Sequence, residues 1–307
     1  MPTTHFWDKE IPVDLKLIQY IDQSVRSKCP PNTQFHSITP SGSSYWARTA
    51  KISASDSTNN LSTPFFLKVH QGPQGKDMAS CEYHAMTLLH NAHFFLCCFT
   101  NLSNKIPSVA NFPALIANFH KNNKNKSPTG EFGFPITMPN KIFDAEEKTH
   151  SPDEKFQKLR QNITTKVIPR LLRPLETEGR VLKPTLVHSD LWDGNASVDV
   201  DTGKPVIFDA TPLCIVLGQL IRVSTDELGP WWCPRYKMTD EYIEEYIKHF
   251  PKSEPVEDFE DRGAFYNLRF DLHASSLYLG NLKHRQIAIN TMKRPLDKYP
   301  LGYEWYA

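Results

Sequence analysis

The sequence predicts an α+β protein with two lobes, a small first lobe built on an antiparallel sheet and a second lobe that is mostly helical. With 307 residues, the chain is long enough to form two lobes. Short alternating apolar runs, which are typical of strands, end near residue 100, and helical spacing of apolar residues dominates after that point. We therefore expect an N-terminal lobe over residues 1–99 and a C-terminal lobe over residues 100–307.

The overall composition excludes several classes of protein. Hydrophobic residues make up 39% of the chain and charged residues 22%, which is typical of globular proteins. The formal net charge of +1 gives no overall attraction to nucleic acid or to an anionic membrane. No run of 18 apolar residues occurs, the N-terminus lacks the apolar stretch of a signal peptide, and the six cysteines lack zinc-site spacing. We therefore expect a soluble, cytoplasmic, monomeric protein with no nucleic-acid or membrane partner.

The first lobe begins with a predicted helix and continues with predicted strands. Residues 12–26 carry Leu, Ile and Val at helical spacing, which predicts one helix. Two short apolar runs, at residues 45–52 and 64–69, flank a polar loop at 53–63. This arrangement indicates two antiparallel strands.

The main helix of the first lobe is predicted over residues 77–90, with Asp77 as its N-terminal cap. The apolar run at residues 93–99 predicts a buried strand. Only Asn91 and Ala92 separate the two, and two residues reach about 7 Å, whereas a five-residue strand spans about 17 Å. We therefore expect either that the helix loses its last turn or that the lobe is distorted.

The second lobe starts with segments that resemble loops. Residues 123–134 and 138–155 concentrate Pro, Asn and Lys, which favours irregular structure. After them, helical spacing of apolar residues predicts helices over 154–178, 239–250 and 264–293.

The segment "LVHSDLWDGN", residues 186–195, places polar groups densely after an apolar stretch. A predicted hairpin follows it and delivers Asp209 at the end of an apolar strand, 19 residues after Asp190 and 14 after Asn195. This spacing is typical of phosphoryl-transfer sites of the protein-kinase type. There, one carboxylate lies near the acceptor hydroxyl, while an amide oxygen and a second carboxylate hold Mg²⁺. The alternative is that these residues only form turns before a hairpin.

The first lobe offers an independent test, because a kinase also needs a lysine on a strand and a glutamate on the next helix. Lys68 lies inside the apolar run "FFLKV", and Glu82 follows it by 14 residues within the predicted helix. A single lysine in a strand is usually an edge or snorkelling residue. The order and spacing of all these residues together favour the kinase interpretation. The segment "SITPSGSSYW", with Gly42 as its one glycine, is the expected phosphate-covering turn.

Several segments resemble the fructosamine/ketosamine-3-kinase family, particularly its fungal members. "LVHSDLWDGN" resembles the catalytic loop H-G-D-L-W-x-G-N of that family, and Trp192 distinguishes it from aminoglycoside phosphotransferases and choline kinases. The similar segments extend from about residue 36 to about residue 285, and among them are "FFLKVHQGPQGKDM", "SPTGEFGF", "VIPRLLRPLETEGR" and "DVDTGKPVIFDA". The resemblance implies a two-lobed protein-kinase-like fold, with ATP and Mg²⁺ as cofactors.

The resemblance also implies a role for individual residues. Asp190 is the expected general base, and Asn195 and Asp209 are the expected Mg²⁺ ligands. Lys68 and Glu82 are the expected ion pair that binds the nucleotide, and Gly42 is expected in the turn over the phosphates. The expected adenine hinge comprises Cys97, Cys98 and Phe99. Trp192 and His188 are expected on the substrate side. We interpret His188 as a brace of the catalytic loop rather than as a proton carrier.

The activity that the resemblance implies is phosphorylation of the 3-hydroxyl of ketosamines, which leads to deglycation. The expected partners are glycated proteins, with ribulosamine or fructosamine adducts on lysine, or small ketosamines. Two alternatives stay open. One is a pseudokinase that keeps nucleotide binding without transfer, and the other is a kinase that acts on another small hydroxylated amine.

The sequence also departs from the family pattern. Ser189 occupies the position of the family's glycine, and we expect the backbone there not to need a positive φ. The Trp-rich stretch after "FGF" is replaced by "PITMPNKIFDAEEKTHS", and "TPLCIVLGQL" follows "FDA" in place of aromatic and acidic residues. These losses predict a thinner acceptor-side wall and a shortened segment beside Asp209.

Overall fold

The computed structural model of the chain describes eight ranges, which are residues 14–41, 47–91, 102–103, 105–123, 137–181, 185–210, 227–278 and 281–303. The chain folds into two compact units. The first unit comprises residues 1–84 and 97–102, and the second comprises residues 85–96 and 103–307. Over the described ranges, none of the helices combines the length and the apolar character that crossing a membrane requires.

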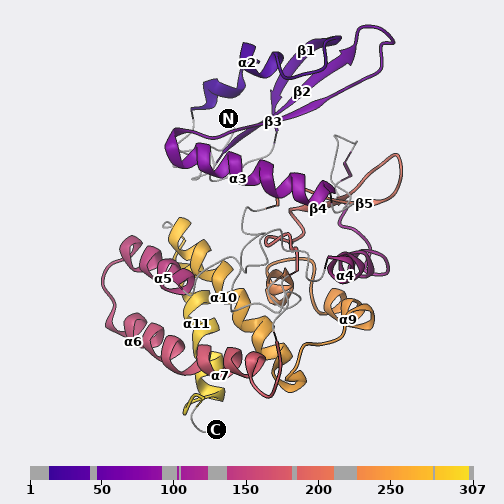
Figure 1. Cartoon of the computed structure of the whole chain (residues 1–307). Coiled ribbons are helices and arrows are strands. Elements are labelled where there is room, and N and C mark those ends of the chain that lie inside the picture. Colours follow the sequence, from indigo (N-terminus) through magenta and orange to yellow (C-terminus); the bar gives the residue numbers. More distant parts are fainter. Residues whose placement is uncertain are drawn as a thin grey trace. The chain divides into compact units, whose positions relative to one another are not determined.

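The first unit contains a three-stranded antiparallel sheet (Figure 1). Its strands β1 (Thr33–Pro40), β2 (Arg48–Asp56) and β3 (Phe65–Val69) lie in the order β1-β2-β3. Every second residue of β2, from Ala50 to Ala54, is buried, so one face of this central strand forms the core of the unit. The predicted antiparallel strands are therefore confirmed, and β2 continues four residues beyond the predicted end at residue 52.

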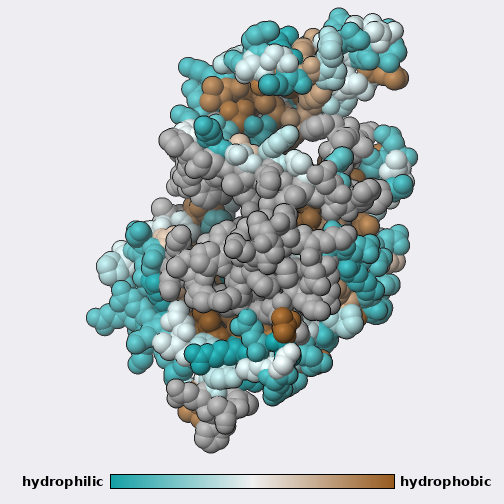
Figure 2. Space-filling view, viewed as in Figure 1, coloured by the Kyte–Doolittle hydropathy of each residue, from teal (hydrophilic) through white to brown (hydrophobic). Residues whose placement is uncertain are grey.

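The predicted helix over residues 12–26 is wrong as a single element. A 3₁₀ helix, η1 (Leu15–Ile18), and a short helix, α2 (Gln23–Arg26), occupy the region instead. The carboxylates of Asp14 and Asp22 accept hydrogen bonds from the backbone two residues later, so each starts a new short element rather than continuing one helix. Ile18 is buried in the unit, whereas Leu15 is 46% exposed. Figure 2 shows hydrophobic side chains on the visible face of this unit.

Helix α3, the main helix predicted for the first lobe, spans Gly72–Asn91 and thus begins five residues before the predicted start, and its residues up to His84 belong to the first unit. Asp77 consequently lies inside the helix and does not cap it. The helix keeps its last turn up to Asn91, so of the two outcomes expected from the short join, the shortened helix is excluded. The predicted strand at residues 93–99 lies outside the described residues.

The second unit contains two hydrophobic cores. In the first, α4 (Phe112–Asn122) packs against α9 (Asp240–His249) and the short η5 (Gly229–Trp232). The predicted apolar face of the helix over 239–250 is confirmed, because its side chains Tyr242, Ile243 and Tyr246 are buried there.

The second core lies among the remaining helices (Figure 1). These are α5 (Thr137–Thr149), α6 (Glu154–Asn162), α7 (Ile168–Leu172), η3 (Arg173–Glu176), η6 (Val256–Asp258), α10 (Phe259–Leu277) and α11 (Leu282–Lys298). The loop expected over residues 138–155 is wrong, since α5 covers most of it. Phe143 is buried against Phe156, and Glu146 is buried against Ser275, so packing overrides the polar composition of this segment.

Two of the predicted helices are interrupted. The helix over 154–178 contains a π-helical turn, Ile163–Val167, just before Pro169. Proline lacks an N–H group and its ring clashes with the carbonyl four residues earlier, so a wider turn relieves that conflict. The helix over 264–293 is divided into α10 and α11, and the side chain of Asn281 starts α11 by accepting a hydrogen bond from the backbone of Lys283.

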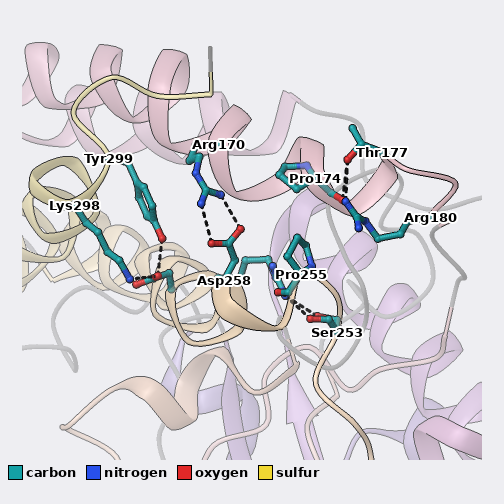
Figure 3. Close-up of polar contacts among 11 residues, drawn as sticks. Arg170, Pro174, Thr177, Arg180, Ser253, Pro255, Asp258, Lys298 and Tyr299 are labelled. Atoms are coloured by element: carbon teal, nitrogen blue, oxygen red, sulfur yellow. Dashed lines mark hydrogen bonds and ion pairs between the residues drawn. The ribbon is translucent and has the colours of Figure 1, made fainter. Parts of the chain in front are cut away.

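A polar network also ties the helices of the second core together (Figure 3). Arg170 of α7 forms an ion pair with Asp258, with nitrogen–oxygen distances of 2.7 and 3.1 Å. Arg262 of α10 donates hydrogen bonds to the carbonyl oxygens of Ser253 and Pro255. Tyr299 donates to the carboxylate of Asp261. We call these residues the distal network.

Candidate active site

The predicted hairpin after the catalytic loop is confirmed. Strands β4 (Ala196–Val198) and β5 (Pro205–Ile207) pair antiparallel, and the turn between them closes through the hydrogen bond from Gly203 N to Asp199 O, 2.8 Å. Gly203 has a φ of +68°, a left-handed conformation that glycine adopts without strain. The hairpin returns the chain to the loop at 186–195, because Phe208 N donates to Asn195 O.

Asp190 and Asn195 contact each other directly. The amide nitrogen of Asn195 donates to the Asp190 carboxylate at 3.0 Å and to the Asp190 carbonyl oxygen at 2.9 Å. Because the amide nitrogen makes both contacts, the amide oxygen of Asn195 is directed elsewhere and can coordinate a cation. The side chain of Asn195 is buried, so its orientation is well defined.

Asp209 follows β5 with a φ of +59°, a conformation that turns the chain sharply at this point. Its negative charge raises the pKa of Asp190 and opposes the lowering of the pKa of His188. The structure therefore brings Asp190, Asn195 and Asp209 together within the second unit.

His188 is buried and braces the loop at both ring nitrogens. Its Nε2 contacts the carbonyl oxygen of Phe208 at 2.9 Å, and its Nδ1 accepts from the backbone N–H of Asp190 at 3.4 Å. Burial lowers the pKa of His188 to about 4, so the ring is neutral near pH 7. These contacts support the interpretation of His188 as a brace and separate it from solvent.

Ser189 has a φ of +67°, so our expectation that no positive φ is needed here is wrong. Its backbone N–H donates to the Glu227 carboxylate at 2.9 Å, and its carbonyl oxygen accepts from Arg269 at 2.7 Å. The two contacts hold the peptide groups in a left-handed conformation that costs a non-glycine residue roughly 1–2 kcal/mol. This explains physically why a glycine suits the position.

The backbone N–H of Trp192 donates to the Asp190 carbonyl oxygen at 3.2 Å, and the nearby Trp192 side chain lowers the pKa of the Asp190 carboxyl group. Its ring lies directly against the backbone of Gly194, where any Cβ atom would collide with the indole. A glycine two residues after Trp192 is therefore a steric requirement of this loop.

Asp190 has a raised pKa of about 6. Burial is the largest cause, the positive charge of Arg269 lowers the pKa, and the negative charge of Asp209 raises it further. A carboxylate with a pKa near the working pH can accept a proton and release it again, which suits a general base.

Several residues around the site were not predicted from the sequence. Glu227 and Arg269 hold Ser189 from segments 38 and 80 residues away, and Trp231 donates to the carbonyl oxygen of Leu191 at 2.9 Å. No spacing rule links them to the loop. The one available signal was a charged residue, Arg269, in a largely apolar helical stretch.

The first unit brings together Lys68 and Glu82, as predicted. Lys68 Nζ lies 2.9 Å from Glu82 Oε2, and the two side chains are 17% and 23% exposed. His70 is close to the same carboxylate at 3.8 Å. Gly42 and the predicted hinge residues Cys97, Cys98 and Phe99 lie outside the described residues.

The site of the second unit fits a magnesium ion by the chemistry of its donors. Mg²⁺ prefers oxygen ligands and is usually held by one or two carboxylates together with phosphate and water. The amide oxygen of Asn195 and the carboxylate of Asp209 provide such oxygens beside Asp190. Over the described part of the chain, no cluster of three or more His, Cys, Asp or Glu side chains suits a metal ion.

Comparison with known proteins finds a family whose sequence model matches most of the chain, and relatives that match part of it. The sequence model of the family described as fructosamine kinase matches residues 74–298. A chloroplastic protein-ribulosamine 3-kinase of Oryza sativa subsp. indica is 37% identical over 101 residues, 33% of this chain and 26% of that protein. A probable ketoamine kinase of Staphylococcus aureus is 31% identical over 124 residues, 40% of this chain and 36% of that protein. The chain thus aligns with about a third or less of these relatives.

Solved structures show the fold. A choline kinase from Cryptosporidium parvum aligns over 90% of this chain and 91% of its own, with a TM-score of 0.52 and 10% identity. An ethanolamine kinase of Plasmodium vivax aligns over 86% and 82%, with a TM-score of 0.50 and 15% identity. The chain therefore has the two-lobed choline-kinase-like fold, with a small antiparallel N-terminal sheet and a mostly helical remainder, as the sequence predicted.

Proposed function

Since this chain belongs to the fructosamine kinase family, we propose that it transfers the γ-phosphoryl group of ATP to the 3-hydroxyl of a ketosamine. The acceptor is a ribulosamine or fructosamine adduct on a protein lysine or on a small amine, and its phosphorylation leads to deglycation. The names of the rice and staphylococcal relatives support this class of acceptor.

Asp190 acts as the general base in this reaction. It accepts the proton of the acceptor hydroxyl while the oxygen of that hydroxyl forms a bond to the γ-phosphorus and the bond to the leaving ADP breaks. Its raised pKa, of about 6, and its contact with the Asn195 amide keep it oriented and able to take the proton.

The proposal also assigns residues to the binding of the nucleotide. Asn195 and Asp209 would hold Mg²⁺, which neutralises phosphate charge when bound. Lys68, which pairs with Glu82 at 2.9 Å, would bind the phosphates, and the family resemblance assigns Gly42 to the phosphate-covering turn. The family resemblance assigns the adenine hinge to Cys97, Cys98 and Phe99. The transition state is loose, so the residues work mainly by position and charge.

One observation carries the proposal: the Asn195 amide contacts the Asp190 carboxylate at 3.0 Å, and the negative charge of Asp209 lies near enough to raise the pKa of Asp190. A set of turn-forming residues without chemistry would have no reason to bury a carboxylate beside a second one, because burial disfavours the charged form.

The test is phosphate transfer from ATP and Mg²⁺ to ribulosamine-lysine and fructosamine-lysine, measured by mass spectrometry, with an aminoglycoside and choline as other acceptors. We expect transfer to at least one ketosamine and none to the other two. Transfer to the aminoglycoside or choline alone would instead make the chain a kinase for another hydroxylated amine.

Nucleotide binding is measured separately by thermal shift with millimolar ATP and Mg²⁺, because a ligand bound only by the native state raises Tm. Binding without transfer to any acceptor would identify a pseudokinase and reject the proposed activity. Absence of both binding and transfer would reject the nucleotide site as well.

A further inference from the structure

An aromatic pair lies beside the proposed base. The rings of Trp192 and Tyr236 are 5.1 Å apart at their centroids and are tilted by 40°. The Trp192 ring also rests against Gly194, as described above. Both rings are half-buried. Contacts with Gly194 and with Tyr236 therefore restrict the positions open to this indole.

The segment that carries Tyr236 runs alongside the catalytic loop. Trp231 donates to the carbonyl oxygen of Leu191, and the backbone N–H of Lys237 donates to the Asp193 carboxylate at 2.8 Å. These two contacts flank the aromatic pair on both sides in the sequence. They set the register that places Tyr236 opposite Trp192.

Tyr236 is itself fixed by Arg235. The guanidinium of Arg235 donates to the Tyr236 hydroxyl at 3.0 Å, and its carbon lies 4.8 Å from the ring centroid. The same guanidinium pairs with Asp271 of α10 at 3.3 Å. Asp271 is fully buried and accepts from Asn267 at 3.0 Å and from Thr291 of α11 at 2.8 Å. A chain of contacts thus connects α10 and α11 with the ring of Trp192, and the backbone N–H of Trp192 donates to the Asp190 carbonyl oxygen at 3.2 Å.

We propose that Tyr236 is a positioning residue for Asp190, acting through the Trp192 indole, and that Arg235 and Asp271 hold Tyr236 in place. The proposal rests on the proposed function, in which Asp190 is the base. A base has to be held within a small distance and angle of the productive geometry, and a displacement of about 1 Å can lower the rate about 100-fold. The side chains that restrict the indole therefore restrict the base as well.

The kinetic test compares Tyr236→Ala with Tyr236→Phe. Alanine removes the ring, so kcat with a ketosamine falls by about 10- to 100-fold while KM changes little, because the lost effect is orientation in the transition state. Phenylalanine keeps the ring contact and restores most of kcat. The matched control is Tyr278→Ala, which removes another half-buried tyrosine whose ring lies 5.4 Å from His284, and whose kcat stays near wild type.

Two kinetic results would overturn the proposal. A rise in KM at unchanged kcat would make Tyr236 a substrate contact, and equal losses for the alanine and phenylalanine variants would assign the effect to the hydroxyl. Arg235→Gln tests the same link with both rings present, and we expect a smaller loss of kcat in the same direction. Unchanged kcat in Arg235→Gln would remove Arg235 and Asp271 from the proposal.

A second measurement does not depend on activity. The chain has six tryptophans, and their indole N–H signals can be followed by ¹H–¹⁵N spectroscopy, with Trp192→Phe assigning one of them. In Tyr236→Ala we expect the Trp192 N–H to exchange with solvent about 10-fold faster, while the other five keep their rates and show that the protein is folded.

An unchanged exchange rate at Trp192 would overturn the positioning link even if the wild-type protein is an active kinase. Faster exchange in a protein that transfers no phosphate would instead retain the link and reject the proposed function. The two failures are therefore distinguishable.

Discussion

The catalytic loop and the distal network of the second unit are both buried polar structures, but they are built in opposite ways. In the distal network, the charged side chains of Arg170 and Asp258 face each other, and Arg262 faces carbonyl oxygens (Figure 3). In the catalytic loop, Asp190 is half-buried near both Arg269 and a second carboxylate, Asp209, and its neighbour Ser189 has a strained backbone. In the distal network, opposite charge offsets the free-energy cost of burying a charge. In the catalytic loop, part of the cost of burial and of backbone strain remains, and the proposed reaction can use it.

The largest expected effect is that of Asp190→Asn. It should lower phosphoryl transfer by about 10²–10⁴-fold, because the proposed base is lost. The free energy of unfolding should stay equal or increase. The pKa of Asp190 in the folded protein, about 6, lies above its ordinary value of 3.8. Ionisation of this carboxyl group therefore lowers the free energy of unfolding as pH rises through that interval, and the loss persists at pH 7. Turnover and urea unfolding at pH 7.5 test both statements. A variant that is inactive and also less stable would break the contrast between the two networks.

In the distal network, we expect a substitution to lower stability and to leave activity unchanged. Asp258→Ala leaves the Arg170 guanidinium, which is 9% exposed, without its carboxylate, so the free energy of unfolding should fall by about 3–5 kcal/mol. Activity per folded molecule should not change. The control is Glu245→Ala, which removes one partner of an exposed ion pair with Lys248 and should leave the urea midpoint unchanged. A loss for Asp258→Ala as small as that of the control would show that the buried pair contributes nothing.

A third buried group, His120, can be compared with these two networks by measuring stability as a function of pH. Burial lowers the pKa of His120, packed against Tyr246, to about 3. The unfolded state binds a proton below pH 6.5 that the folded state excludes, so stability falls as pH decreases, by about 1.4 kcal/mol per pH unit. We expect His120→Phe to flatten the dependence of urea unfolding on pH between 6 and 4.5 by that amount. Equal slopes for the wild type and the variant would contradict the exclusion of the proton.

The smallest expected effect is at Ser189. Ser189→Gly should raise the free energy of unfolding by about 1 kcal/mol, because glycine adopts the positive φ of this position without the Cβ penalty. Ser197→Gly in strand β4 should have the opposite sign, since glycine lowers the stability of a strand by roughly 0.5–1 kcal/mol. Thermal or urea unfolding measures both. A destabilised Ser189→Gly variant would show that the hydrogen bonds from Glu227 and Arg269 already remove the strain.

Much of the arrangement was predictable where it depends on short spacings. The pairing of β4 with β5 follows from a glycine turn between two apolar runs, and the Lys68–Glu82 ion pair follows from their positions on a strand and the next helix. Helix α5 was missed because its polar composition hides two buried residues, Phe143 and Glu146, whose partners lie in other helices. Local composition cannot reveal a contact with another helix, and Ser275 lies 129 residues away from Glu146.

The sequence by itself determined the fold class, the hairpin and the order of the proposed site residues, because each depends on periodicity or on spacings within one segment. Only the tertiary structure decided how the loop is held. The positive φ of Ser189 depends on Glu227 and Arg269, and the place of the Trp192 ring depends on Tyr236 and Gly194. The physical reason is that a strained backbone and a buried charge persist only when distant side chains supply the hydrogen bonds and packing that maintain them.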